Sequence, residues 1–195
     1  MKKTRNNLTR IYRESFDYIH DSKNFIYLAI GIFFGASLIS FLLPVPQSIV
    51  GQILEFVRQL LEETSGMGQL DLIRFIFLNN LQSSFIGLAF GVLLGIFPAL
   101  ILIVNGYILG FVASVSVQNE GILVLWRLFP HGIFELPAVF ISTGLGLKFG
   151  TFIFQKNKGD SFRKYLWNSL QAFLLIVVPL LIVAAIIEGT LIAYS

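Results

Sequence analysis

Long runs of apolar residues that contain no charged side chain occur at residues 25–43, 85–104 and 172–187. Each run is close to the roughly 20 residues with which an α-helix crosses a hydrocarbon core of about 30 Å. Polar residues gather between these runs and before the first one. The pattern predicts an all-α integral membrane protein in which residues 1–195 form one domain, a polytopic helix bundle of about five transmembrane segments.

The five predicted segments are residues 25–43, 81–104, 106–118, 130–149 and 170–192, with residues 70–78 leading into the second. Pro44 and Pro46 end the first segment, because proline lacks the amide hydrogen that continues a helix. Asn105 and Gly106 form a pair typical of tight turns, so we expect a turn there. The third segment would then be only about 20 Å long. It is a short tilted span, a re-entrant hairpin with residues 121–129, or a helix broken within protein.

Two amphipathic segments flank the first span. Residues 1–24 are basic and are expected to lie on the inner leaflet as an amphipathic helix, with a solvated topogenic tail as the alternative. The predicted helical face consists of Leu8, Ile11, Tyr12, Ser15, Phe16 and Ile19. Residues 44–80 repeat apolar positions at helical spacing, and we expect an extracytoplasmic helix that lies on the outer leaflet or caps the bundle.

The composition supports a membrane location and narrows the chemistry. Hydrophobic residues make up 55% of the chain and charged residues 13%, about half the charged fraction of an ordinary soluble domain. Cysteine is absent, which excludes disulfides, thiolate metal sites and cysteine nucleophiles. The net charge of +3 reflects membrane topology better than nucleic-acid binding, which we do not expect.

The basic residues predict the orientation in the membrane. Eleven of the fourteen fall before the first span or around the loop after the fourth: Lys2, Lys3, Arg5, Arg10, Arg13, Lys23, Lys148, Lys156, Lys158, Arg163 and Lys164. The alternate loops hold Arg58, Arg74 and Arg127. Because cytoplasmic loops are enriched in lysine and arginine, we expect a cytoplasmic N-terminus and an extracytoplasmic C-terminus.

Small residues recur four apart in most of the predicted spans. The rows are Gly31 and Gly35; Gly87, Gly91 and Gly95; Gly106, Gly110 and Ser114; and Ser142, Gly146 and Gly150. At this spacing they form a smooth stripe along a helix, which allows neighbouring backbones to approach closely in lipid. We expect internal packing, with dimer or sliding surfaces as the alternative.

A set of polar residues lies where the predicted topology places the outer ends of the helices: Asn79, Asn80, Arg127, His131, Glu135 and Glu188. We expect these six to lie at one depth and to form one cluster, because an ionisable group in an apolar helix usually faces the protein interior. Three arrangements remain open. They are a structural ion-pair network, a proton relay for transport, or a divalent metal held by His131, Glu135 and Glu188.

No catalytic motif of a soluble enzyme is present, and the chain has no phosphate-binding loop, nucleophile elbow or H-E-x-x-H zinc motif. We therefore favour a non-enzymatic protein without a cofactor, apart from the candidate metal.

The run Pro130-His131-Gly132-Ile133-Phe134-Glu135-Leu136-Pro137-Ala138, together with Asn79-Asn80, Asn105-Gly106 and Glu188-Gly189, resembles the stage II sporulation protein M family of multi-pass membrane proteins. The resemblance extends from about the first span to the last. In endospore-forming bacteria it implies a membrane scaffold that holds cell-wall-degrading enzymes at the septum during engulfment. Similar proteins occur in bacteria that do not sporulate and in archaea, so the resemblance implies the architecture more firmly than the role.

We therefore expect a membrane-embedded scaffold or assembly protein that recruits protein partners, or a second copy of itself, through its bundle and outer helix. One rival is a transporter of ions or small solutes, favoured by the interrupted region at residues 105–132. A second rival is an intramembrane metal-dependent enzyme.

Overall fold

The computed structural model describes residues 2–194, and the side chains of residues 9–125, 132, 133 and 135–194. Its helices are α1 (Lys2–Asp21), α2 (Lys23–Leu42), α3 (Gln47–Thr64), α4 (Gln69–Ala89), α5 (Ile96–Glu120), α6 (Phe129–Gly150), α7 (Lys158–Ala172) and α8 (Val178–Ala193). Short 3-10 segments lie between them at η1 (Phe90–Val92), η2 (Ile122–Leu128) and η3 (Thr151–Phe154), and a π-helical turn, η4 (Phe173–Val177), joins α7 to α8. Residues 2–194 contain no strand, so the all-α prediction is confirmed.

Five helices in the described chain are long and apolar enough to cross a membrane: Lys23–Leu42, Gln69–Val92, Ile96–Glu120, Glu135–Phe154 and Lys158–Ala193. The predicted number of spans is confirmed. The last of them is 36 residues long, which corresponds to about 54 Å of helix. Because a hydrocarbon core is only about 30 Å thick, this helix extends beyond the membrane.

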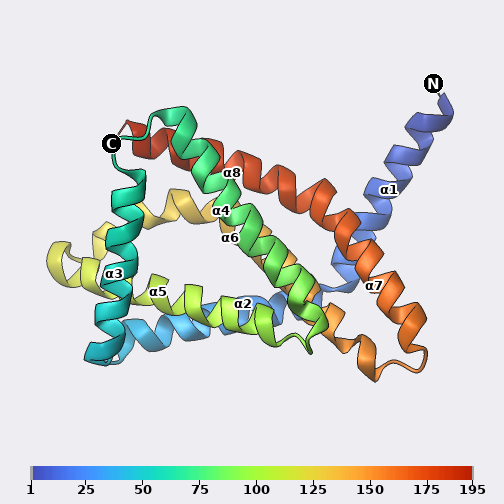
Figure 1. Ribbon diagram of the computed structural model, residues 1–195, viewed down its shortest axis with the longest axis horizontal. Helices are drawn as coiled ribbons and strands as arrows, with labels where there is room; N and C mark the ends of the chain where they lie inside the picture. Colours follow the sequence, from blue (N-terminus) through green and yellow to red (C-terminus); the bar gives the residue numbers. More distant parts are fainter. Residues whose placement is uncertain (1, 195) are drawn as a thin grey trace.

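The central helix of the bundle is α6, which contacts α2 and α5 on one side and α4 and α8 on the other (Figure 1). The amphipathic helices α1 and α3 run crosswise at opposite ends of the five spanning helices (Figure 1). We call these the α1 end and the α3 end. The two helix pairs diverge toward the α3 end, where α3 connects α2 to α4 across the opening between them.

Glycines allow α2 and α5 to pack closely. A Cβ atom at Gly106 would meet the main-chain carbonyl oxygen of Phe33, and one at Gly110 would meet the carbonyl oxygen of Ser37. Ser40 donates a hydrogen bond of 2.7 Å from its Oγ to the carbonyl oxygen of Tyr107 across the same interface. In lipid, close backbone contact of this kind provides dispersion energy and weak Cα–H···O bonds where hydrophobic association is absent.

A second glycine contact joins α4 to α6. A Cβ at Gly146 would collide with the main-chain carbonyl oxygen of Gly87 on α4, and one at Gly91, in the η1 segment that follows α4, would collide with the backbone of Gly146. The Oγ of Ser142 donates to the carbonyl oxygen of Ser84, so the hydroxyl is satisfied within the apolar interior. Gly150 lies against Gly95 in the turn before α5. The expectation of internal packing is confirmed for the glycines of these rows and for Ser142.

The row on α2 behaves differently. A Cβ at Gly31 or Gly35 would meet no other described atom within 4 Å, and both residues are exposed. The prediction that this row packs internally is therefore wrong within the described monomer, because α2 turns the opposite face toward α5.

The predicted boundary between the second and third spans is also wrong. The second span runs from Gln69 to Val92 and the third from Ile96 to Glu120, with a tight turn between them. Leu94 and Gly95 adopt positive φ angles of 59° and 71° in this turn. Pro98 stands in the first helical turn of α5, where its missing N–H needs no partner. Residues 81–104 are therefore two helices with a turn between them.

Two further predictions depend on that boundary. Asn105 and Gly106 lie inside the continuous 25-residue helix α5, so there is no turn between them. The segment at residues 106–118 is the second half of this helix and not a short span, a re-entrant hairpin or a broken helix. The predicted extracytoplasmic segment at residues 44–80 is too long, because residues 69–80 belong to the second span.

Candidate functional site

Glu188 lies on α8, close to the α3 end of the bundle. Its neighbours along the helix, Ala184, Ala185 and Gly189, are buried, and its own side chain is half-buried with the Oε2 atom shielded from solvent. Gly189 contacts Ile73 of α4, and Gln69 Nε2 donates a hydrogen bond of 3.0 Å to Thr190 Oγ1. These contacts place Glu188 at the level of the first turns of α4.

Glu135 lies on α6, which runs alongside α4 in the same direction (Figure 1). The Ser142–Ser84 hydrogen bond fixes the register of the two helices. Counted from that contact, Glu135 lies about 10 Å back along α6 and Asn80 about 6 Å back along α4, so Asn80 is the closer of the two to the α1 end. Glu135 is half-buried, and both carboxylates make a hydrogen bond, ion pair or electrostatic interaction within the chain.

The two asparagines do not open the second span as predicted. They lie about 15 Å into α4, measured along its axis from Gln69. Asn80 is half-buried on the face that also carries the buried residues Ile76 and Ser84, whereas Asn79 is exposed. The prediction of a single depth is therefore wrong. Glu188, Glu135 and Asn80 are staggered along the bundle, and Asn79 faces away from its interior.

The side chains of Arg127, Pro130 and His131 lie outside those that the structure describes. Among the described residues no three histidine, aspartate or glutamate side chains are grouped closely enough to hold a metal ion. The set of His131, Glu135 and Glu188 includes an undescribed side chain, so the metal site stays a prediction.

Comparison with known proteins identifies the family. The profile of the family described as stage II sporulation protein M matches residues 24–191. The chain belongs to the stage II sporulation protein M family. The predicted family is therefore confirmed, and the match includes α3 and all five spanning helices apart from Lys23 at the first end and residues 192–193 at the last.

Two relatives of this family member are uncharacterized proteins of Methanocaldococcus jannaschii. One is 33% identical over 138 residues, which is 67% of this chain and 60% of the relative. The other is 39% identical over 75 residues, or 37% of this chain and 42% of the relative. The chain thus spans less than two thirds of the length of either relative. No solved structure matches it.

Four motif residues of this stage II sporulation protein M family member lie on helices α5 and α6 and affect their local structure and packing. Gly132 lies in the first turns of α6, where a Cβ would come within 3.1 Å of Leu136 Cδ1. Pro137 stands inside α6 and removes one hydrogen bond from its ladder. Asn105 is exposed and donates from Nδ2 to the carbonyl oxygen of Ile101 at 2.8 Å. Gly106 provides the contact with α2.

A second polar site, at the α1 end, did not emerge from the sequence. Lys148 of α6 donates from Nζ to Ser22 Oγ at 2.8 Å. The same ammonium lies 4.1 Å from the ring centroid of Tyr18 and 5.8 Å from that of Tyr165. A cation held between aromatic faces gains stability from the ring quadrupoles. This arrangement, which we call the Lys148 cage, joins α1, α6 and α7.

Tyr18 also connects α1 to α7 directly, because its hydroxyl lies 3.2 Å from Ser169 Oγ. Burial raises the pKa of the Tyr18 phenol from 10.0 to about 12. Ser15, Tyr18 and Ser22 are buried, whereas Tyr12 and Phe16 of the predicted face are exposed. The buried face of α1 is thus rotated from the predicted one, because the helix packs on α7.

Proposed function

We propose that this protein is a membrane scaffold that recruits a protein partner through α3. The observation that carries the proposal is the exposure of apolar side chains on a helix crossing the α3 end. Leu54, Phe56 and Leu61 are 53%, 51% and 64% exposed. Within α3, whose side chains are all described, only Ile53 is buried. A helix of this kind has an apolar surface available for another molecule.

The charge of α3 favours a protein over a lipid surface as that molecule. The helix carries Glu55, Glu62 and Glu63 against the single cation Arg58, which forms an ion pair of 2.9 Å with Glu62. Helices that lie on anionic lipid are usually rich in lysine and arginine on their polar face. An acidic helix is repelled by such a surface, whereas a protein partner can complement it.

The proposed orientation places α3 outside the cytoplasm. The loop after η3 and the start of α7 lie at the α1 end together with α1 and Lys23 (Figure 1). Eleven of the fourteen basic residues occur in these segments and at Lys148, which the positive-inside rule assigns to the cytoplasm. In the family's implied role the partner is a wall-degrading enzyme, which acts on that outer side.

Site-specific photo-crosslinking tests the proposal. A benzophenone amino acid at position 54 or 61 should give a discrete protein adduct in native membranes. The same group at Leu38, which is exposed on the spanning helix α2, should give none. The double substitution Leu54→Glu and Leu61→Glu should remove the partner without changing the amount of protein in the membrane. Gln59→Glu on the polar face should retain it.

The adduct also identifies the occupant. A dimer of this chain would show that α3 mediates self-association, and a different protein would show recruitment. Adducts with lipid alone at both positions would contradict the scaffold proposal.

Transport is a second candidate, favoured by the staggered polar residues on α4, α6 and α8. Glu188, Glu135 and Asn80 occupy successive levels, and the Ser142–Ser84 hydrogen bond lies farther toward the α1 end. Ionisable groups in such positions often mark ion or proton paths. Flux into proteoliposomes should fall in Glu135→Gln and Glu188→Gln and persist in Asn79→Leu, whose site is exposed. Equal flux in all four proteins would remove this candidate.

A further inference from the structure

An apolar groove of about 720 Å³ lies between α4 and the helix formed by α7, η4 and α8. Leu78 and Phe85 line it on α4, and Trp167, Leu174 and Val178 line it on the other side. The rings of Phe85 and Phe173 are in contact at a centroid distance of 5.7 Å. The groove opens to the surroundings of the bundle, because Phe85, Trp167 and Leu174 are 45%, 62% and 63% exposed.

The length of the groove matches one leaflet of a membrane. From Trp167 to Val178 the helix rises about 16 Å at 1.5 Å per residue. This is close to half of a hydrocarbon core of about 30 Å. The π-helical turn at Phe173–Val177 widens the helix within this stretch, and Pro179 follows it. A single acyl chain has the length and the chemistry to lie along such a surface.

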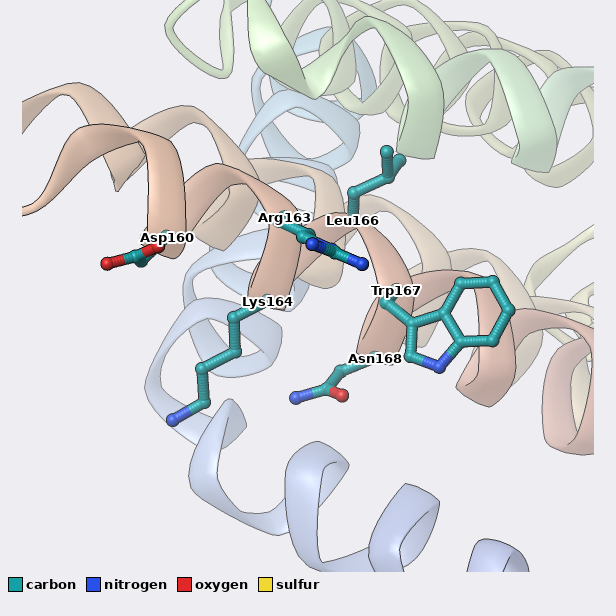
Figure 2. Close-up of a pocket in the computed structure, with 6 residues that line it drawn as sticks. All are labelled: Asp160, Arg163, Lys164, Leu166, Trp167 and Asn168. Atoms are coloured by element: carbon teal, nitrogen blue, oxygen red, sulfur yellow. The ribbon is translucent and has the colours of Figure 1, made fainter.

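A second open cavity, of about 450 Å³ and with charged side chains among its lining residues, adjoins the groove, and Trp167 lines both. Its other lining residues are Asp160, Arg163, Lys164, Leu166 and Asn168. Figure 2 shows Arg163 extending toward Trp167, whereas Lys164, from the same helix, extends away from Trp167 on its flexible side chain. Two cations against one carboxylate leave the cavity positively charged. Tryptophan at the junction of a polar and an apolar surface is typical of the membrane interface.

We propose that the cavity and the groove together bind one anionic phospholipid from the leaflet at the α1 end. Arg163 and Lys164 hold the phosphate by charge-assisted hydrogen bonds, and Asn168 adds a neutral amide donor. The Trp167 ring marks the interface, and Gln171, which lines the groove one turn farther on, lies where the glycerol esters would be. The acyl chain occupies the groove between Phe85 and Leu174.

The two tryptophans of the chain provide a direct test. Trp126→Phe leaves Trp167 as the single tryptophan, which can be excited selectively at 295 nm or above. The full-length variant is reconstituted into vesicles of zwitterionic lipid that contain a small fraction of brominated lipid, either anionic phosphatidylglycerol or zwitterionic phosphatidylcholine. Bromine quenches tryptophan on contact, so quenching reports lipid occupancy beside Trp167.

Per mole, the anionic brominated lipid should quench Trp167 fluorescence at least about fivefold more effectively than the zwitterionic one. The reason is that one basic residue at an anionic surface contributes about 1 kcal/mol. Arg163→Ala with Lys164→Ala should remove the preference. The matched control, Lys156→Ala with Lys158→Ala, removes two exposed cations at the same end and should retain it. Leu174→Phe narrows the groove without changing charge and should reduce quenching by the anionic lipid.

Three results would overturn the proposal. Equal quenching by the two lipids in the Trp126→Phe protein would show ordinary boundary lipid. Loss of preference in the Lys156 and Lys158 control would show a diffuse surface potential. Removal of the preference by millimolar glycerol phosphate would show that the cavity binds a headgroup without a chain in the groove. Circular dichroism and thermal melting verify that each variant is folded.

Discussion

Gly110 lies against the main-chain carbonyl oxygen of Ser37, and no space for a methyl group remains between α5 and α2 at this point. A Cβ there would also meet Ser40 Oγ, the group that donates to the Tyr107 carbonyl oxygen. One added carbon therefore disturbs both the helix contact and its hydrogen bond.

Gly110→Ala should destabilise the protein by about 1–3 kcal/mol, the usual cost of overfilling a packed interior. For a chain of this size the melting temperature should fall by about 2–4 °C per kcal/mol. The matched control is Gly31→Ala, whose new methyl group has open space and which should be neutral or slightly stabilising. Thermal melts in one detergent compare the two variants, and equal melting temperatures would contradict the α2–α5 contact.

The Lys148 cage should hold α1 on the bundle. Lys148→Met retains the aliphatic chain but removes the cation over Tyr18 and the hydrogen bond to Ser22. A hydrogen bond to a charged group contributes about 1.5–3 kcal/mol, so α1 should detach about tenfold more often. Trypsin cleavage at Arg10 and Arg13 in the reconstituted protein measures the effect. Lys156→Met, at an exposed lysine of the same end, should leave the rate unchanged.

Tyr18 should titrate late. The pKa of its phenol is raised from 10.0 to about 12 because burial disfavours the charged form. A raised pKa means that the folded state retains the proton more strongly than the unfolded state, so this stabilisation is complete below pH 10 and is lost as pH rises toward 12. Ultraviolet absorbance near 295 nm should show a late-titrating component that Tyr18→Phe lacks. Identical curves for the two proteins would contradict the burial of Tyr18.

The orientation can be measured directly because the chain lacks cysteine. A membrane-impermeant maleimide should label Gln52→Cys, on α3, in intact cells. It should label Asn157→Cys, at the α1 end, only after the cells are permeabilised. Both positions are exposed, so accessibility within the protein does not limit either reaction. The reverse labelling pattern would invert the proposed topology.

The sequence predicted the number of spans and both amphipathic helices, because each depends on local periodicity and on the energy of placing apolar segments in lipid. The α4–α5 boundary was misplaced because residues 85–104 form one uninterrupted apolar run and hydropathy does not detect a turn made of Leu93, Leu94 and Gly95. The local signals for the turn were Gly95 and Pro98. The turn predicted at Asn105–Gly106 is absent because an asparagine inside a helix can donate to the carbonyl oxygen four residues earlier, as Asn105 does.

The sequence identifies residues of the candidate site by type but does not give their relative positions. Residue type identified Glu135 and Glu188 as groups that need interior surroundings, but their relative depth requires the register of α4, α6 and α8. The sequence indicates only a topological role for Lys148, because Tyr18 and Tyr165, its aromatic neighbours, come from parts of the chain remote in sequence. Only the tertiary structure brings them together.

The helix Lys158–Ala193 is continuous and is long enough to reach both faces of the membrane. Its protruding end carries the contacts with α1, and its far end carries Glu188. A tilt of the protruding end would therefore move Glu188 in the opposite direction without any helix unfolding. A movement at the α1 end can in this way reach a carboxylate near the α3 end through one continuous helix.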